Sequence, residues 1–436
     1  MGFNGKDENL YNDLLSKNSI LKINANNEGD MIGYSSEKSS IQYYESNDIN
    51  AIYESFLKSA NSDLIFRGES DVYDAPNASV HRFDDINFSQ MISEYSSEVN
   101  ADLLPIEEKN FLLYAQHHGL PTPLLDITEI LNSALYFACN EDGNQNTNFG
   151  VLHIFESNFC IDISSIIENR KWDINIINEY NKFLKNDYSE FFSILINKLF
   201  SNNYIRTVID QLSHDLIEYI NENVLKNESA FTTSRNKESF NQYETYLNEI
   251  KIFIKKVNQN KIGDILYSGD FDLLLIKYSK QIDVLGISKD TNELSSDIMK
   301  NLLRNDPVLL YLCLLDIALF YLSSNLFIEN ESKIPQSLPP LPYFLIKPSS
   351  KFGRIRAQGG IFFYQISGEI PIAYNTVGMG VSIKNKKITQ KIISNRRILI
   401  TDKKKILKQL EYLGINRGTI YLDPDNIAKH IRNKFS

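Results

Sequence analysis

The sequence has few cysteines, an excess of negative charge and no long apolar run free of charge, and each feature excludes a class of protein. Three cysteines among 436 residues lie far apart, so they fit neither a disulfide framework nor the paired spacing of a structural zinc site. The formal net charge of −10 argues against general, non-specific binding to nucleic acid or to anionic membranes. We therefore expect a protein of a reducing compartment, and we place it in the cytoplasm.

No segment combines the length and the apolarity of a transmembrane helix. The best candidate is 307–327, but Asp316 lies in its middle, where a charge costs about 2.5–3.5 kcal/mol on insertion scales. We interpret this segment as a buried helix, and we expect no membrane partner. The first fifteen residues have neither an apolar core nor a basic leader, so we expect no secretory signal.

The pattern of apolar runs and breaks predicts four parts. Residues 1–40 form a polar leader, and 41–160 alternate short apolar runs with loops. Residues 161–335 show helical periodicity and few glycines, and 336–436 follow a proline-rich break with strand-like runs and a final helical pattern. We predict an α+β fold, with a mixed, mostly antiparallel sheet made from both ends of the chain and surrounded by helices. The middle part is predicted to be a large inserted helical subdomain.

Five short runs have the composition of β-strands, and one pattern near the C-terminus is typical of a helix that ends at Gly414. The strand runs are "SDLIFRG" (62–68), "FGVLHIFES" (149–157), "YFLIKP" (343–348), "GIFFYQI" (360–366) and "RRILIT" (396–401).

The segment 111–139 crowds two histidines, two prolines and an aspartate before a helical pattern. Asp126 followed by Glu129 fits a helix N-cap and its reciprocal glutamate, but Asp126 suits a functional role equally well. His117 and His118 are consecutive, so at most one of them points into a given site. No pair of histidines has zinc-ligand spacing, and we predict no metal site.

Arg67 is the sharpest candidate for a binding residue. An arginine beside Gly68 at a strand end places a planar, permanently charged fork next to backbone that a ligand can approach closely. This arrangement suits a phosphate or a pyrophosphate. An ion pair with a carboxylate such as Asp126 explains the arginine as well.

The segment 347–408 is basic: it contains fourteen lysines and arginines, and its acidic residues are Glu369 and Asp402. This local excess points to a phosphate-bearing small molecule or a nucleic acid as partner. A basic face that packs against the acidic helical part accounts for it equally well. Within the segment, Gln358 and two glycines follow a pair of arginines and lead into a strand.

Five motifs in sequence order together resemble the FRG domain family. They are "FRG" (66–68), "APNASVHR" (75–82), "LLYAQHHGLPTPLLDITEILNSALYFAC" (112–139), "RIRAQGGIFF" (354–363) and "LGINRGTIYLDPDNIAKHI" (413–431). The resemblance implies a bacterial or phage-associated protein with a role in defence, such as abortive infection or a toxin-like effector. The aromatic-Arg-Gly strand end is also similar to the first motif of arginine-type ADP-ribosyltransferases, which implies that Arg67 holds NAD as a substrate.

The resemblance implies one cleft with a catalytic group and a set of ligand contacts. The catalytic group is Arg67, His117, Asp126 and Gln358, and the ligand contacts are Arg67, Gly68, Glu69, Gln116, Thr122, Arg354 and Arg356. Those transferases use a glutamate where Gln358 stands, and a neutral amide orients a ribose hydroxyl without supplying negative charge.

Three functions stay open at this point. The first is an enzyme for NAD-dependent ADP-ribosyl transfer or NAD hydrolysis. The second is a nucleotide- or nucleic-acid-binding sensor without chemistry, which uses the basic segment 347–408. The third is a structural or interaction protein with a protein partner.

Overall fold

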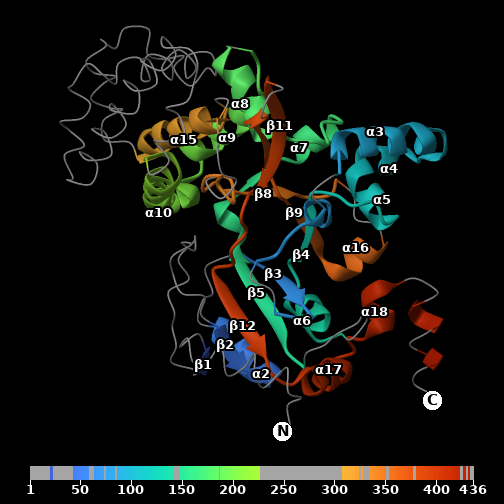
Figure 1. Ribbon diagram of the computed structural model, residues 1–436. Coiled ribbons are helices and arrows are strands. Elements are labelled where there is room, and N and C mark those ends of the chain that lie inside the picture. Colours follow the sequence, from blue (N-terminus) through green and yellow to red (C-terminus); the bar gives the residue numbers. More distant parts are fainter. Residues whose placement is uncertain are drawn as a thin grey trace. The chain divides into compact units, whose positions relative to one another are not determined.

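The computed structural model, shown in Figure 1, divides the chain into two compact units. The first contains residues 1–173, 342–365 and 391–436, and the second contains 174–341 and 366–390. The structure describes residues 20–22, 43–57, 63–72, 75–83, 86–140, 148–185, 187–225, 307–323, 326–327, 334–349, 353–376, 380–422, 426–428 and 431–432. The predicted helix near residues 8–17 lies outside these ranges.

A nine-stranded mixed sheet forms the centre of the first unit, in the order β1-β2-β12-β5-β3-β4-β9-β8-β6. The pairs β1–β2, β2–β12 and β6–β8 are parallel, and the other five neighbouring pairs are antiparallel. The sheet contains strands from both parts of the chain, with β12, β9 and β8 placed among N-terminal strands, which confirms the predicted α+β fold. The strands are β1 (Ile20–Lys22), β2 (Tyr43–Ser46), β3 (Leu64–Glu69), β4 (Leu124–Thr128), β5 (Gly150–Glu156), β6 (Cys160–Asp162), β8 (Tyr343–Ile346), β9 (Gly360–Tyr364) and β12 (Arg396–Ile400).

Helices of the first unit cover one face of this sheet. Apolar side chains of α2, α6, α17 and α18 form a buried cluster with Phe66, Leu152, Ile154, Ile398 and Ile400 of the central strands. Because side chains alternate along a strand, Ile65 and Phe155 belong to a second cluster on the other face. The first unit as a whole contains the helices α2 (Ile49–Leu57), η1 (Ser79–Arg82), α3 (Phe88–Val99), η2 (Asn100–Asp102), α4 (Pro105–Lys109), α5 (Phe111–His117), α6 (Leu131–Cys139), η3 (Ser157–Phe159), α7 (Ser164–Glu168), α16 (Gly353–Gln358), α17 (Lys403–Tyr412) and α18 (Arg417–Tyr421).

Helix α6 packs with its backbone directly against the sheet. A Cβ atom added at Gly68 of β3 would lie 1.8 Å from the carbonyl oxygen of Ala134, and one added at Gly150 of β5 would lie 2.1 Å from that of Ala138. Neither distance is sterically allowed, so only glycine fits at both positions. Gly68 was predicted as a ligand contact, and this packing gives it a structural role beside any such contact.

Strand β3 separates from β4 after a single register pair. Phe66 pairs with Thr128, whereas β3 pairs with β5 over its full length from Leu64 to Glu69. On its other side, β4 pairs with β9 over five residues. β3 and β4 therefore join at Phe66 and Thr128, and they are split beyond this pair, where residues 67–69 of β3 have no register partner in β4.

The N-cap prediction for Asp126 is wrong. Asp126 lies inside β4, where it is paired with Phe362 of β9, and α6 begins only at Leu131. The N-cap residue of α6 is Ile130, and no side chain caps the helix; Thr128 Oγ1 accepts a hydrogen bond from the backbone of Ile130 at 2.9 Å. Residues 124–128 pair with β9 over their whole length and are buried except for Asp126, so sheet pairing overrides the local capping pattern.

The second unit combines helices with a small sheet. Its elements are α8 (Ile176–Leu184), α9 (Glu190–Ser201), α10 (Asn203–Tyr219), the π-helix η4 (Ile220–Leu225), α15 (Pro307–Ser323), β7 (Leu326–Phe327), β10 (Ser367–Thr376) and β11 (Gly380–Thr389). Asp316 of α15 is buried and accepts a hydrogen bond from the Tyr180 hydroxyl at 2.7 Å, which confirms the buried-helix interpretation. No helix in the described ranges has the length and apolarity to cross a membrane.

The predicted part boundaries at 40, 160 and 335 stay predictions. The division by contacts begins the second unit at Ile174 and adds to it the hairpin of β10 and β11, which lies within the last predicted part.

We predict that Gly150→Ala destabilises the protein by about 1–3 kcal/mol or more, because the new methyl group overlaps the α6 backbone. Urea denaturation followed by circular dichroism measures the change. Gly360→Ala is the matched control, since its Cβ would come no closer than 3.3 Å, to the Cγ2 methyl of Ile355. Equal stability of both variants and the natural protein would show that α6 does not pack as closely as the structure has it.

Candidate functional site

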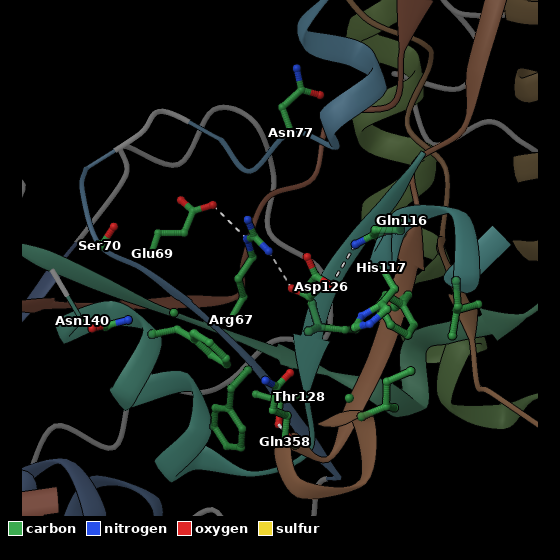
Figure 2. Close-up of a pocket in the computed structure, with 18 of the residues that line it drawn as sticks. Arg67, Glu69, Ser70, Asn77, Gln116, His117, Asp126, Thr128, Asn140 and Gln358 are labelled. Carbon is green, nitrogen blue, oxygen red and sulfur yellow. Dashed lines mark hydrogen bonds and ion pairs between the residues drawn. The ribbon is translucent and has the colours of Figure 1, made fainter. Parts of the chain in front are cut away.

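A pocket of about 780 Å³ lies along the split between β3 and β4 in the first unit (Figure 2). This volume is within the usual range for small-molecule sites. Its lining comes from β3, β4, α5, α6, α16, β9, α18 and the stretch 75–82. The lining residues are Phe66, Arg67, Gly68, Glu69, Ser70, Ala75, Asn77, Arg82, Leu113, Gln116, His117, Asp126, Ile127, Thr128, Phe137, Asn140, Ile355, Gln358, Gly360, Phe362 and Tyr421.

Arg67 bridges the two separated strands. Its Nε donates to Glu69 Oε1 at 2.9 Å on the same strand, and its Nη1 donates to the backbone oxygen of Asp126 at 2.7 Å on β4. The guanidinium thus takes the place of a ladder hydrogen bond that the split removes. The side chain is 14% exposed, and no acceptor among the described residues is bonded to its Nη2. Arg67 is fixed on two sides and presents its remaining donors to the pocket.

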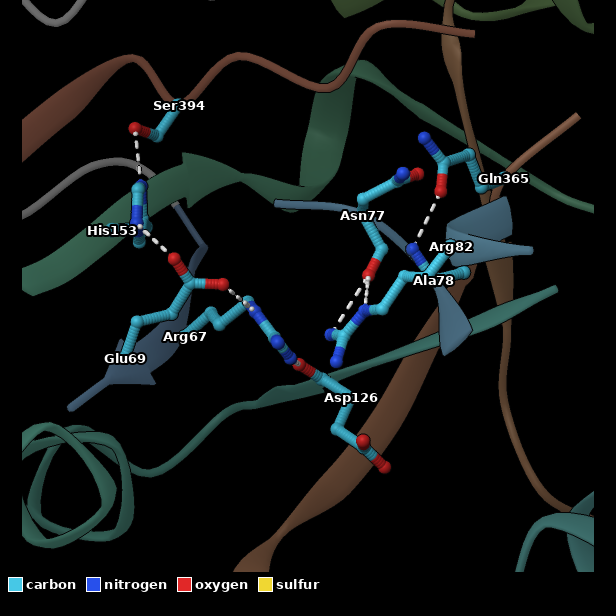
Figure 3. Close-up of polar contacts among 9 residues, drawn as sticks. All are labelled: Arg67, Glu69, Asn77, Ala78, Arg82, Asp126, His153, Gln365 and Ser394. Carbon is cyan, nitrogen blue, oxygen red and sulfur yellow. Dashed lines mark hydrogen bonds and ion pairs between the residues drawn. The ribbon is translucent and has the colours of Figure 1, made fainter. Parts of the chain in front are cut away.

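Glu69 is held from the side opposite Arg67 by a buried histidine (Figure 3). His153 Nε2 donates to Glu69 Oε2 at 3.2 Å, and its Nδ1 accepts from the Ser394 hydroxyl at 3.0 Å. This assignment of protons follows from the partners, because a carboxylate only accepts. The chain of contacts therefore runs from Ser394 through His153 and Glu69 to Arg67.

The electrostatics of this chain keep Glu69 charged. Burial alone would raise the pKa of Glu69, but the hydrogen bond from His153 and the charge of Arg67 outweigh it and bring the pKa down to about 2. Burial lowers the pKa of His153 below its usual value, against the pull of Glu69, so the ring stays neutral at pH 7. Glu69 is thus a permanent carboxylate whose charge is compensated by Arg67.

Asp126 presents the exposed carboxylate of the pocket. Gln116 Nε2 donates to Asp126 Oδ1 at 2.9 Å, and Gln116 in turn accepts from the Thr122 hydroxyl at 2.6 Å. The carboxylate points away from the Arg67 guanidinium, which meets only the backbone oxygen of this residue (Figure 3). Thr122 is fully buried and does not line the pocket, so its place is behind Gln116.

Gln358 lines the pocket from the end of α16, and two of its polar groups bond to the protein. Its Nε2 donates to the backbone oxygen of Ile420 at 3.2 Å, and its own backbone oxygen accepts from the Thr128 hydroxyl. Gly359 follows with a φ of 58°, a conformation that favours glycine. The side chains of Arg354 and Arg356, in the same helix, lie outside the described part of the structure.

The structure brings all four predicted catalytic residues to one pocket, and the predicted ligand contacts Gly68, Glu69 and Gln116 line it as well. Their roles stay predictions. Three residues that contribute to this region, His153, Ser394 and Arg82, were not among the predicted site residues. His153 sits in an apolar strand run, and nothing in the sequence indicates its partner 84 residues earlier. Arg82 and Asn77, whose backbone oxygen it contacts, lie in the same motif at 75–82, but most of the pocket that Arg82 lines comes from other parts of the chain.

Parts of the basic segment 347–408 serve the interior. Arg396 is buried with its guanidinium 4.4 Å from the centre of the Tyr44 ring, and Arg397 Nε donates to Ser394 at 3.1 Å. Lys403 is buried and donates to the backbone oxygen of Ser70. In addition, the part of the segment at 366–390 belongs to the second unit. The described residues contain no group of three or more His, Cys, Asp or Glu that fits a metal ion.

Comparison with protein families gives one match, to the FRG domain over residues 62–147. This range contains β3, the stretch 75–82, α5, β4 and α6, and so most of the pocket wall. It confirms the FRG-domain resemblance of the sequence. No curated protein and no solved structure matches the chain.

We predict that Glu69→Gln lowers the free energy of unfolding at pH 7 by on the order of 3 kcal/mol, because a carboxyl with a folded pKa of about 2 stabilises the protein above its ordinary value of 4.5. Since that stabilisation is lost as the pH falls through the folded pKa, the difference between variant and natural protein shrinks from about pH 5 toward pH 2.

Urea denaturation of both proteins across this pH range measures the effect. Glu98→Gln, an exposed carboxylate of α3 outside the pocket, is the control for a charge change. A difference that is constant with pH would mean that Glu69 is not the carboxylate held by this chain of contacts.

Proposed function

This chain carries an FRG domain, and on that basis we propose that its pocket binds NAD and cleaves the bond between ribose C1′ and the nicotinamide nitrogen. The observation that carries the proposal is the pairing, in one pocket, of a fixed guanidinium at Arg67 with an exposed carboxylate at Asp126. The volume of about 780 Å³ is large enough for a dinucleotide.

Asp126 takes the role that the transferases give to a glutamate. When the bond to nicotinamide breaks, its electron pair leaves with the nicotinamide and positive charge develops on the ribose, which a nearby carboxylate stabilises. Gln358 cannot supply this charge, and the carboxylate of Glu69 is already paired with Arg67. Gln116 supports Asp126 by fixing one carboxylate oxygen.

The other pocket groups suit the rest of the substrate. Aromatic side chains of Phe66, Phe137, Phe362 and Tyr421 offer ring faces to the nicotinamide. Arg67 Nη2 donates to an oxygen of the ribose or phosphate. His117, exposed at the end of α5, accepts the proton of the water or hydroxyl whose oxygen attacks C1′. Water as the attacking group gives ADP-ribose, and an acceptor hydroxyl gives ADP-ribosylation.

An NAD-consuming enzyme fits the role of a toxin-like effector in bacterial defence against phage, and we place the protein there. Binding without chemistry is the second candidate, and it favours a nucleotide over a nucleic acid. Arg396, Arg397 and Lys403 are buried, which leaves the basic segment without three of its cations for a nucleic-acid surface.

We predict that the purified protein, with cell extract or phage components added as triggers, releases nicotinamide from NAD, and that Asp126→Asn lowers the rate about 100-fold or more. Arg67→Ala lowers it as well, because it removes the donors that bridge the split. Mass spectrometry of nicotinamide and of protein-linked ADP-ribose is the measurement, with folding of each variant checked by circular dichroism.

Glu129→Gln is the matched control, because it changes an exposed carboxylate one residue after β4 that does not line the pocket. It should leave the rate unchanged. Equal rates for Asp126→Asn and Glu129→Gln would remove Asp126 from the reaction. No nicotinamide release under any condition would leave binding without chemistry as the function.

A further inference from the structure

Arg82 lines the same pocket and has no role in the reaction proposed above. It ends η1 and belongs to the stretch 75–82, which crosses from β3 toward α3. Its side chain is exposed, whereas that of Arg67 is mostly buried. What this second guanidinium does depends on how firmly it is held and on whether its charge is balanced.

The stretch that carries Arg82 is pinned to the rest of the unit at two points. Gln365, just after β9, accepts from the backbone of Ala78 at 2.7 Å with its side chain and contacts His81 Nε2 at 3.0 Å with its backbone oxygen. Thr122, just before β4, accepts from the backbone of Val80 at 3.2 Å and donates its own amide to the Ser79 hydroxyl at 3.0 Å. Arg82 therefore stands on a fixed wall.

The guanidinium itself is oriented by one backbone oxygen. Arg82 Nε and Nη2 donate to the carbonyl of Asn77 at 3.3 and 3.1 Å (Figure 3). Among the described residues, no acceptor is bonded to Nη1. A planar fork held at one edge, with its other edge open to a pocket, has the geometry for binding a phosphate oxygen pair.

The two arginines differ in charge balance. Arg67 forms an ion pair with Glu69, which stays ionised, so that pair adds no net charge to the pocket. The partner of Arg82 is a neutral carbonyl, and no carboxylate of the described residues forms an ion pair with it. Among the described residues that line the pocket, Arg82 therefore carries the positive charge that is not in an ion pair, and Asp126 carries an exposed negative charge.

From this we infer that Arg82, and not Arg67, is the residue that holds the diphosphate of the ligand, so that the pocket selects nucleoside diphosphates and their esters over nucleosides. The inference rests on the proposed function only for the choice of NAD as one such ester. Arg67 then orients the ribose side through hydrogen bonds, and Arg82 supplies the charge. The recognised group is the diphosphate, which ADP carries as well as NAD.

Isothermal titration calorimetry of the full chain with ADP, AMP and adenosine tests this. The natural protein should bind ADP more tightly than AMP and adenosine, and its ADP affinity should fall as sodium chloride rises. Arg82→Gln should weaken ADP binding about tenfold or more, because it removes charged hydrogen bonds, while adenosine binding is unchanged. The same variant should also lose most of the salt dependence.

Lys109→Gln is the matched control, since it removes one exposed positive charge of the same unit outside the pocket. It should leave ADP affinity within twofold, roughly the effect of a distant screened charge. Arg82→Lys, which keeps the charge and loses the fork, should retain the salt dependence with reduced affinity. ADP binding by Arg82→Gln that equals the natural protein, in affinity and salt dependence, would overturn the inference.

The outcome separates this inference from the proposed reaction. ADP binding that depends on Arg82 without any NAD cleavage removes the reaction and leaves the diphosphate site. If Arg82→Gln cleaves NAD with an unchanged KM, Arg82 does not hold the diphosphate, and the proposed reaction stands.

Discussion

The pocket depends on the guanidinium of Arg67, which spans the gap where β3 and β4 part. A split in a sheet leaves backbone groups without ladder partners. Arg67 Nη1 donates to the carbonyl of Asp126 and so supplies a partner where β3 and β4 part. A mostly buried guanidinium in turn requires a counter-charge, which Glu69 provides, and Glu69 requires the donor that His153 provides. The contacts of Asp126, Arg67, Glu69 and His153 thus depend on one another, and together they stabilise the split between β3 and β4.

The close approach of α6 sets which way these side chains point. Gly68 faces the α6 backbone, and because side chains alternate along a strand, Arg67 and Glu69 face the opposite side, toward His153. A bulkier residue at position 68 would push the helix away and shift the strand. The Arg-Gly sequence in this strand therefore joins two needs, since the glycine fixes the helix and the arginine bridges the split.

Much of the sheet could be predicted because its strands are local apolar runs. The runs at 62–68, 149–157 and 396–401 became β3, β5 and β12, whose burial follows from composition. Asp126 was placed in a helix cap because the capping pattern is local, whereas its true partner strand, β9, lies more than 230 residues later. His153 was missed for the same reason, since its partner Glu69 lies 84 residues earlier. Arg82 was missed although Asn77, the residue whose backbone oxygen it contacts, is only five residues away, because the sequence does not show that Arg82 lines the pocket. Local patterns predict elements, and only the fold shows which charges remain unbalanced.

The anionic ligand that we propose would have to bind to an acidic chain. The net charge of −10 repels anions at long range, but salt screens that repulsion within about 8 Å at physiological ionic strength. Binding of an anion then depends on hydrogen-bond donors close to it whose side chains are already fixed, because each side chain immobilised on binding costs about 0.5–1.5 kcal/mol. Arg67 and Arg82 are both held by backbone carbonyls before any ligand arrives. In this proposal Arg67 bridges the split in the sheet, and the charge of Arg82 serves the ligand.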